Sequence, residues 1–418
     1  MVLDVLTTWT RIKRDSRIDS ITSTSFTTSK ERKFKGWGLQ LLSSSSSTFA
    51  RDFMMEHTKH EILHHNNTKT VFIAEDAKTH KHYIIKEILI TSPLHQLPVT
   101  NEYDILRRIF PRDNMTPEQI ARTGIAAVPD IYFELVRVSL VYPLYPMDLF
   151  GCINYNTDKF QTDGFSEEII KIFLAQFLEA LKTLKDSNVV HRDIKPENVC
   201  LQENGNLVLT DFELAIVVPS NHHDISSVAT PTTPNVLVGT SLYIAPETFR
   251  TLEYSYQTDL WAVAILACEL HSSNYPWNLN EHMSPEEVGR TILSTTPVKP
   301  PGMSNALWGF LKKILVNKDI RINVEEAMED PLFSSYTFST MEEGSVVQGN
   351  VFDTHPCLVP VSEICQERGH VTNVVNAPLR EKQLEAKAKT QSPLISGDRR
   401  LYVESLNPKG VEQRSLED

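Results

Sequence analysis

The chain has 418 residues, 41% of them hydrophobic, and a formal net charge of −12, which suits one folded domain with extensions. The acidic balance disfavours a nucleic-acid-binding groove and is compatible with basic peptide substrates. Five scattered cysteines without a CxxC pair argue against a disulfide framework or a zinc site. The scattered cysteines suit a reducing compartment, so we expect an intracellular, cytoplasmic protein, with a nuclear location as the alternative. The longest apolar run, residues 260–268, is too short to span a bilayer.

The first segment, residues 1–59, has the composition of an extension rather than of a folded domain. It is rich in serine and threonine, with a run of five serines at 43–47, and carries a basic stretch at 11–14. Such a composition buries too little apolar surface to fold alone, so we expect disorder here. The basic stretch is more simply a solvated arm than a nuclear import signal.

A β-rich region is predicted from about residue 60. Short runs at 71–74, 82–88, 131–136 and 138–142 have the apolar and β-branched residues of strands. Lys86 lies in the second run, and a helix with Glu102 is expected soon after it. A lysine in a strand is usually only surface charge, so its meaning depends on the rest of the chain.

The next strong signal is an amphipathic helix at 166–188. Its apolar residues recur at a spacing of three and four, and Ser166 followed by two glutamates is a good N-terminal cap. This helix leads the chain directly to the most informative stretch of the sequence.

Residues 191–198 read His-Arg-Asp-Ile-Lys-Pro-Glu-Asn, and an Asp-Phe-Glu motif begins at Asp211. The first motif contains a carboxylate that could accept a proton (Asp193), a cation (Lys195) and an amide (Asn198). An Asn-Gly pair between the motifs predicts a β-hairpin, which would bring Asn198 and Asp211 to the same end. Two oxygen ligands for Mg²⁺, a base and a cation are what transfer of a γ-phosphoryl group requires.

These motifs resemble the catalytic and metal-binding loops of eukaryotic protein kinases of the serine/threonine type. The resemblance implies an α+β, bilobal kinase domain at 60–333, with a small β-rich lobe at about 60–142, a hinge at 143–145 and a larger helical lobe at 146–333. It implies an ATP-dependent enzyme that uses Mg²⁺ and phosphorylates serine or threonine hydroxyls of a protein substrate.

The resemblance also implies roles in the chemistry. Asp193 would orient the substrate hydroxyl and accept its proton, and Lys195 would neutralise the moving phosphoryl group. Asn198 and Asp211 would hold Mg²⁺. Lys195 favours serine and threonine over tyrosine, because the serine/threonine class carries a lysine there that would meet Thr240.

The nucleotide would be held by residues of the small lobe and the hinge. Lys86, paired with Glu102, would contact the α- and β-phosphates. The backbone of Pro143 and Tyr145 would bind adenine; proline lacks only the N–H group, and a carbonyl oxygen suffices at its position.

Three later features resemble the same family. Residues 239–247 resemble the end of a kinase activation segment. Asp259 resembles the buried aspartate that hydrogen-bonds the catalytic loop, and Arg321 resembles the late arginine that pairs with Glu247.

Two features depart from the family pattern. The loop at 64–70, where a glycine-rich loop should lie, contains no glycine, although its asparagines are the next most tolerant residues. Glu213 replaces the glycine of Asp-Phe-Gly and is expected to stiffen the loop, so that Glu213→Gly should raise turnover. These departures favour the alternative of a pseudokinase that acts as a binding or scaffolding module; a small-molecule kinase is a weaker alternative, given the motif at 239–247.

Two segments remain. The loop after Asp211 carries five candidate phosphorylation sites for an upstream activating kinase, whose phosphate could pair with Arg192. These sites are Ser226, Ser227, Thr230, Thr232 and Thr233. Residues 334–418 lose helical periodicity and gain polar residues, so we expect a mostly disordered tail.

Overall fold

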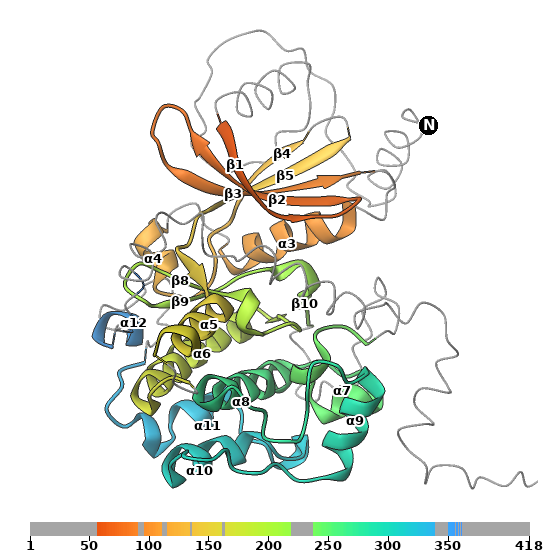
Figure 1. Cartoon of the computed structure of the whole chain (residues 1–418), viewed down its shortest axis with the longest axis vertical. Helices are drawn as coiled ribbons and strands as arrows, with labels where there is room; N and C mark the ends of the chain where they lie inside the picture. The colour runs from red at the N-terminus through yellow and green to blue at the C-terminus, as the bar shows by residue number, and fades with distance from the viewer. Residues whose placement is uncertain are drawn as a thin grey trace, which may run out of the picture.

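The computed structural model describes residues 57–90, 96–110, 115–133, 136–160, 164–218, 237–338, 350–355, 357, 359 and 361. These residues form a sheet-rich lobe above a helical lobe (Figure 1). This is the bilobal α+β arrangement that the sequence predicts. Of the expected N-terminal extension, only residues 57–59 fall within the described part, and they begin the first strand.

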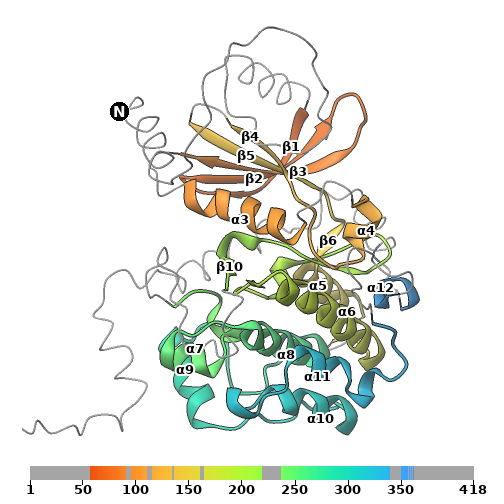
Figure 2. The same ribbon diagram turned by 180° about the vertical axis from the view of Figure 1, so that it is seen from behind.

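The small lobe is built on one antiparallel sheet with the strand order β1-β2-β3-β5-β4. Its strands are β1 (His57–His65), β2 (Lys69–Asp76), β3 (His82–Leu89), β4 (Asp130–Phe133) and β5 (Arg137–Pro143). The helix α3 (Gln96–Ile109) lies below the sheet, between the two lobes, as both views show (Figures 1 and 2). The expected strands and helix are therefore present.

Strand periodicity decides which side chains of β3 reach α3. Successive side chains of a strand point to opposite faces, so the side chains of Ile85 and Lys86 lie on opposite faces of the sheet. Ile85 is fully buried in a cluster with Phe72 and Val141. Lys86 points to the other face, toward Glu102 of α3.

The large lobe is centred on α6 (Glu167–Asp186) and α8 (Tyr256–Ser272), which pack against each other. The expected cap of α6 is present, because the Ser166 hydroxyl accepts a hydrogen bond from the N–H of Ile169. Helix α8 is buried nearly all round, as its apolar sequence predicts.

The other elements of the described chain surround these two helices. They are α4 (Pro117–Ala121), β6 (Met147–Asp148), α5 (Leu149–Phe160), β7 (Val189–Val190), η2 (Pro196–Asn198), β8 (Val199–Leu201), β9 (Leu207–Leu209), η3 (Phe212–Leu214), β10 (Ile216–Val217), η4 (Ser241–Tyr243), α7 (Pro246–Thr251), α9 (Pro285–Ser294), α10 (Asn305–Ile314), η5 (Lys318–Ile320), α11 (Val324–Met328), η6 (Pro331–Phe333) and α12 (Val351–Thr354).

The predicted hairpin is formed by β8 and β9, and its turn has one left-handed residue, Gly205, with φ of 81°. The Asn-Gly pair predicts two positive φ angles, but Asn204 does not adopt one. A Cβ atom at Gly205 would lie 2.4 Å from the carbonyl oxygen of Cys357, so glycine is also needed for close packing here.

That packing shows that ordered structure continues past residue 333. The described residues from 350 to 361 lie against α6, α4 and the β8–β9 turn, with α12 beside α4 in Figure 2. Asn206 donates to the carbonyl of Phe352 and accepts from the N–H of Cys357, at 3.0 and 2.9 Å. The expectation of a mostly disordered tail therefore does not hold for this short segment, whose apolar side chains are buried by docking; most of 334–418 lies outside the described residues.

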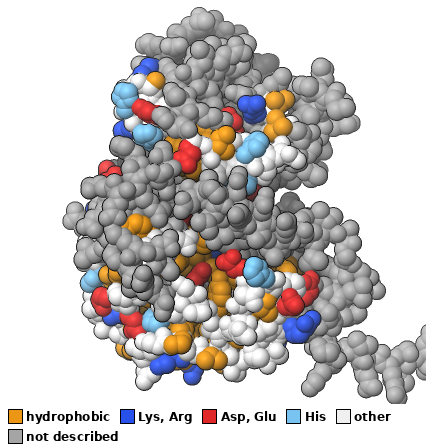
Figure 3. Space-filling model, in the orientation of Figure 1, with side chains coloured by type: hydrophobic (Ala, Val, Ile, Leu, Met, Phe, Trp, Pro, Cys, Tyr) orange, Lys and Arg blue, Asp and Glu red, His pale blue; other side chains and the backbone are white. Residues whose placement is uncertain are grey.

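The described surface carries charges of both signs, and hydrophobic side chains appear in small separate groups on the face shown in Figure 3. Its exposed large hydrophobic residues lie far apart in the sequence: Ile62, Val136, Val217, Val298 and Ile320. In the parts of the chain that the structure describes, every helix is too short or too polar to cross a bilayer.

Candidate active site

The catalytic loop is fixed from below by Asp259 at the start of α8. Its carboxylate accepts hydrogen bonds from the backbone N–H groups of His191 and Arg192, at 2.7 and 3.0 Å. Burial raises the pKa of Asp259, while the two N–H groups and the neighbouring cationic side chains act in the opposite direction. Asp259 therefore has the position that the sequence predicts for it.

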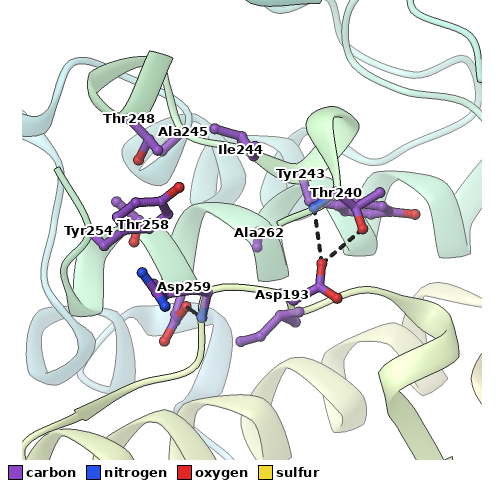
Figure 4. Close-up of a pocket in the computed structure, with 12 residues that line it drawn as sticks. Asp193, Thr240, Tyr243, Ile244, Ala245, Thr248, Tyr254, Thr258, Asp259 and Ala262 are labelled. Carbon is purple, nitrogen blue, oxygen red and sulfur yellow. Dashed lines mark hydrogen bonds between the residues drawn. The ribbon is translucent and has the colours of Figure 1, made fainter. Parts of the chain in front are cut away.

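The Asp193 carboxylate contacts three polar residues, and Figure 4 shows its bonds to one of them, Thr240. Its Oδ1 accepts hydrogen bonds from the N–H and the hydroxyl of Thr240, at 3.0 and 2.8 Å. Its Oδ2 accepts from Nδ2 of Asn198 at 2.9 Å and lies 3.0 Å from Nζ of Lys195. The Lys195 ammonium also donates to the Thr240 hydroxyl at 3.0 Å, so the predicted lysine–threonine contact is present.

Gly239 allows Thr240 to approach the catalytic loop this closely. Its φ of 100° lies in the region that favours glycine, and a Cβ atom would lie 2.4 Å from the carbonyl oxygen of Arg192. A larger residue would push the segment away from Asp193. The sequence singles out the segment 239–247 but does not single out this glycine.

The predicted nucleotide-binding pair is also assembled. Nζ of Lys86 lies 2.8 Å from Glu102 of α3 and 2.9 Å from Asp211. Burial alone would lower the pKa of Lys86, but the surrounding carboxylates, led by Asp211, outweigh it and raise that pKa. Burial would raise the pKa of Asp211, but the neighbouring lysines, led by Lys86, hold it below its usual range.

The two predicted metal ligands lie at one end of the β8–β9 hairpin. The N–H of Thr210 donates to the carbonyl of Asn198, which aligns Asn198 with Asp211. Nδ2 of Asn198 donates twice to Asp193, so its Oδ1 is the atom left to face a cation. Amide and carboxylate oxygens are the donors that Mg²⁺ prefers, so these residues fit a magnesium ion.

The backbone of the Asp-Phe-Glu motif has its unusual φ angle at Asp211, not at Glu213. Phe212 is fully buried with its ring 4.7 Å from the ring of His191, and Asp211 is the left-handed residue, with φ of 61°. Glu213 lies inside η3 with a negative φ. The unusual φ angle therefore falls on Asp211, and Glu213 has no backbone strain in this structure.

The glycine-free loop is shaped by Asn66. Its Oδ1 accepts hydrogen bonds from the backbone N–H groups of Thr68 and Lys69, at 2.9 and 2.7 Å, and its own N–H donates to the carbonyl of Lys69. Asparagine thus closes the turn between β1 and β2 through its side chain, where the family pattern has glycines. The turn is tight without any residue of positive φ at 66–69.

Two contacts of Glu213 were not predicted. Its carboxylate lies 2.7 Å from Nζ of Lys69, and its carbonyl accepts from Nδ2 of Asn101 in α3, at 3.2 Å. Asn101 also donates to the carbonyl of Ala215. Lys69 and Glu213 have opposite charges and both stand where the family pattern has a glycine. Their spacing in the sequence does not predict that they form an ion pair.

The predicted hinge, residues 143–145, lies at the end of β5 and before β6, between the two lobes. Pro143 is the exposed last residue of β5, opposite Tyr83. Tyr145 lies between β5 and β6, outside both strands, so its backbone groups are not part of a sheet ladder. Burial raises the pKa of the Tyr145 phenol, which is partly covered.

Comparison with known proteins agrees with this geometry. Residues 59–333 match the family described as protein kinase domain, and this is well over half of the chain. The chain belongs to the protein kinase family. The predictions of family and fold class are thereby confirmed.

Several curated protein kinases are similar to the chain in sequence. It is 26% identical over 198 residues to human serine/threonine-protein kinase 32C, a match covering 46% of the chain and 39% of that protein. It is 26% identical over 247 residues to a probable serine/threonine-protein kinase of Dictyostelium discoideum (58% and 49%). It is 28% identical over 183 residues to an Aurora kinase of Schizosaccharomyces pombe (43% and 48%). The chain thus spans less than half the length of each of these relatives.

A buried ion pair lies in the large lobe, as predicted. Arg321 donates from Nη1 and Nη2 to the two carboxylate oxygens of Glu247, at 2.5 and 2.9 Å. The Arg321 side chain is fully buried, and its guanidinium stacks on the ring of Trp261 at 4.8 Å. The pair ties the end of the activation segment to the base of α8.

Arg192, the predicted phosphate partner, contacts other protein groups in this structure. Its Nε donates to the carbonyl of Leu214 at 2.6 Å, and its guanidinium lies over the ring of Tyr254 at 5.0 Å. The five candidate phosphorylation sites lie outside the described residues. Pairing of Arg192 with a phosphate therefore stays a prediction.

Proposed function

We propose that this protein is a serine/threonine kinase that transfers the γ-phosphoryl group of ATP to hydroxyl groups of a protein substrate. The observation that carries the proposal is that Asp193, Lys195 and Thr240 form one cluster while Lys86, Glu102 and Asp211 form a second one, both bordering the metal ligands. No charged group that phosphoryl transfer requires is missing from these described residues.

The proposed reaction divides between these two clusters. Asp193 accepts the proton of the substrate hydroxyl, whose oxygen forms a bond to the γ-phosphorus as the bond to the β–γ bridging oxygen breaks and ADP leaves. Lys195 offsets charge on the group in transit. Lys86, held by Glu102, fixes the α- and β-phosphates, and Mg²⁺ bound at Asn198 and Asp211 would neutralise phosphate charge.

The contact between Lys195 and Thr240 supports serine and threonine as acceptors. It brings the activation segment to within 2.8 Å of Asp193 and fills space beside the carboxylate. A lysine at this position, in contact with a threonine of the segment 239–247, is what the resemblance to the serine/threonine class implies. We propose basic proteins as substrates, given the acidic balance of the chain.

A pseudokinase is the second candidate function, and one observation favours it. The N–H groups of Thr68 and Lys69 are bonded to Asn66, so this loop offers fewer backbone donors to phosphates than a glycine-rich loop does. The charged groups of the two clusters are nevertheless all in place, and this favours an enzyme with low basal activity over a pseudokinase. We also propose an intracellular location and activation by an upstream kinase. The candidate sites are Ser226, Ser227, Thr230, Thr232 and Thr233.

Turnover measurements separate the two candidates. Phosphorylation of a generic basic protein with Mg·ATP would be measured for the wild type, Asp193→Asn and Lys86→Met, with phosphosites identified by mass spectrometry. The kinase proposal expects phosphoserine and phosphothreonine from the wild type and at least a hundredfold less from Asp193→Asn. Binding of Mg·ATP without turnover, or equal rates in wild type and Asp193→Asn, would instead support the pseudokinase.

A further inference from the structure

Two backbone N–H groups of the loop between β1 and β2 are bonded to a side chain of the same loop. Oδ1 of Asn66 accepts three hydrogen bonds, from the N–H groups of Thr68 and Lys69 and from the Thr68 hydroxyl. Backbone N–H groups can hold phosphates only when they are free to donate. Two of those groups are already bonded within this turn, so the loop has fewer N–H groups for phosphates, and a cationic side chain nearby would compensate for them.

Lys69 has the right position to be that donor. It begins β2, on the same strand face as Val71, because the two residues are separated by one position. Val71 lies directly opposite Lys86 on β3, and residues opposite each other on paired strands share a face. The sheet therefore directs Lys69 and Lys86 to the same side, above the metal-binding loop.

Glu213 confirms that the two lysines converge. One of its carboxylate oxygens, Oε2, lies 2.7 Å from Nζ of Lys69 and 4.0 Å from Nζ of Lys86. Lys86 also contacts Glu102 and Asp211, whereas Lys69 contacts Glu213. The Lys69 and Glu213 side chains are 22% and 30% exposed, so solvent screens their attraction and the pair can be exchanged.

We propose that Lys69 is a second phosphate-binding cation, which Glu213 holds over the site in the nucleotide-free protein and releases to the phosphates of Mg·ATP. The inference rests on the proposed nucleotide binding and assigns it a further residue. The Glu213 carboxylate competes with the phosphates of Mg·ATP for the Lys69 ammonium, so the two residues act together. Removing the Glu213 charge should therefore tighten Mg·ATP binding. If Glu213 were instead a magnesium ligand, its removal would weaken that binding.

Calorimetric titration of the full chain tests this assignment without relying on turnover. Mg·ATP and adenosine would each be titrated into the wild type, Lys69→Met, Lys69→Arg and Glu213→Gln. Lys81→Met, at an exposed position in the turn after β2, is the matched control. We expect Lys69→Met to weaken Mg·ATP binding about tenfold, the scale of one charge-assisted contact, with adenosine affinity unchanged. Lys69→Arg should retain most of the affinity, and Glu213→Gln should tighten Mg·ATP binding severalfold.

Several outcomes would overturn the assignment. Equal losses for Mg·ATP and adenosine in Lys69→Met would show that the lysine only holds the loop in place. Weaker Mg·ATP binding by Glu213→Gln would show that the pair is a structural clamp or that Glu213 binds the metal. A wild type that binds no Mg·ATP would remove the basis of the assignment. The proposed function fails separately, if the wild type binds Mg·ATP with the expected dependence on Lys69 but shows no turnover.

Discussion

Asp211, with φ of 61°, is the left-handed residue of the Asp-Phe-Glu motif, and Glu213 two residues later lies in a short 3₁₀ turn with a negative φ. The backbone at 213 is therefore compatible with any residue, and a glycine there would bring flexibility without relieving strain. The side chain at 213 acts through its charge, by pairing with Lys69.

This geometry changes the expectation for Glu213→Gly. We expect it to be less stable than Glu213→Ala by about 0.5–1 kcal/mol, because both lose the ion pair but only glycine adds chain entropy to the unfolded state. Urea denaturation of both variants measures the difference. A glycine variant as stable as the alanine variant, or more so, would show that the backbone at 213 is strained after all.

The second prediction concerns Asp193. Asp193→Asn should lower turnover by about 10²–10⁴, because the amide cannot accept a proton and places an NH₂ group against Asn198 or Lys195. Steady-state phosphorylation measures the effect, and thermal unfolding checks the fold. Asp319→Asn, at an exposed position of η5, is the matched control and should leave the rate unchanged. A comparable loss in both variants would mean that the assay does not report on Asp193.

The positions of the candidate active-site residues are predictable from the sequence, because motif spacing fixes them locally. Asp193, Lys195 and Asn198 lie within one loop, and the hairpin that follows determines where Asp211 returns. Lys86 and Glu102 were predictable for a similar reason, since a strand and the next helix carry them. In each case short-range structure decides which groups meet.

The ion pair between Lys69 and Glu213 could not be predicted in this way. These residues are 144 positions apart and come together only in the folded domain, where the small lobe meets the Asp-Phe-Glu motif. The docked segment at 350–361 was missed for a related reason. Its few apolar residues cannot form a core alone, but they are buried once the rest of the domain supplies the surface.

The third prediction uses the buried pair of Arg321 and Glu247. Arg321→Met should destabilise the fold by about 3–5 kcal/mol, because it leaves the Glu247 carboxylate buried without its partner. Urea denaturation measures the free energy of unfolding, and Arg290→Met on the exposed face of α9 is the matched control. In the double variant Arg321→Met/Glu247→Gln the loss should be smaller than the sum of the single losses. Additive losses would mean that the two side chains do not interact.

The fourth prediction tests whether the segment at 350–361 is docked in solution. The thiol of Cys357 is buried, and burial raises its pKa to about 12, so at pH 8 it is both covered and protonated. Cys357 should therefore react with iodoacetamide at least about tenfold more slowly than in the urea-unfolded chain, where its pKa returns to about 8.5. Cys268 in α8, whose pKa burial also raises to about 12, is the internal control.

Asn206→Ala should release this protection. The substitution removes the hydrogen bonds from Asn206 to Phe352 and from Cys357 to Asn206, while Cys268 keeps all its surroundings in the core of the large lobe. Mass spectrometry of digested protein would then show faster labelling of Cys357 at pH 8 and no change at Cys268. Protection of both thiols in the variant would mean that apolar packing alone holds the segment. Rapid labelling of Cys357 already in the wild type would show that the segment is not docked, because a protonated thiol beneath Asn206 has neither the thiolate nor the access that alkylation requires.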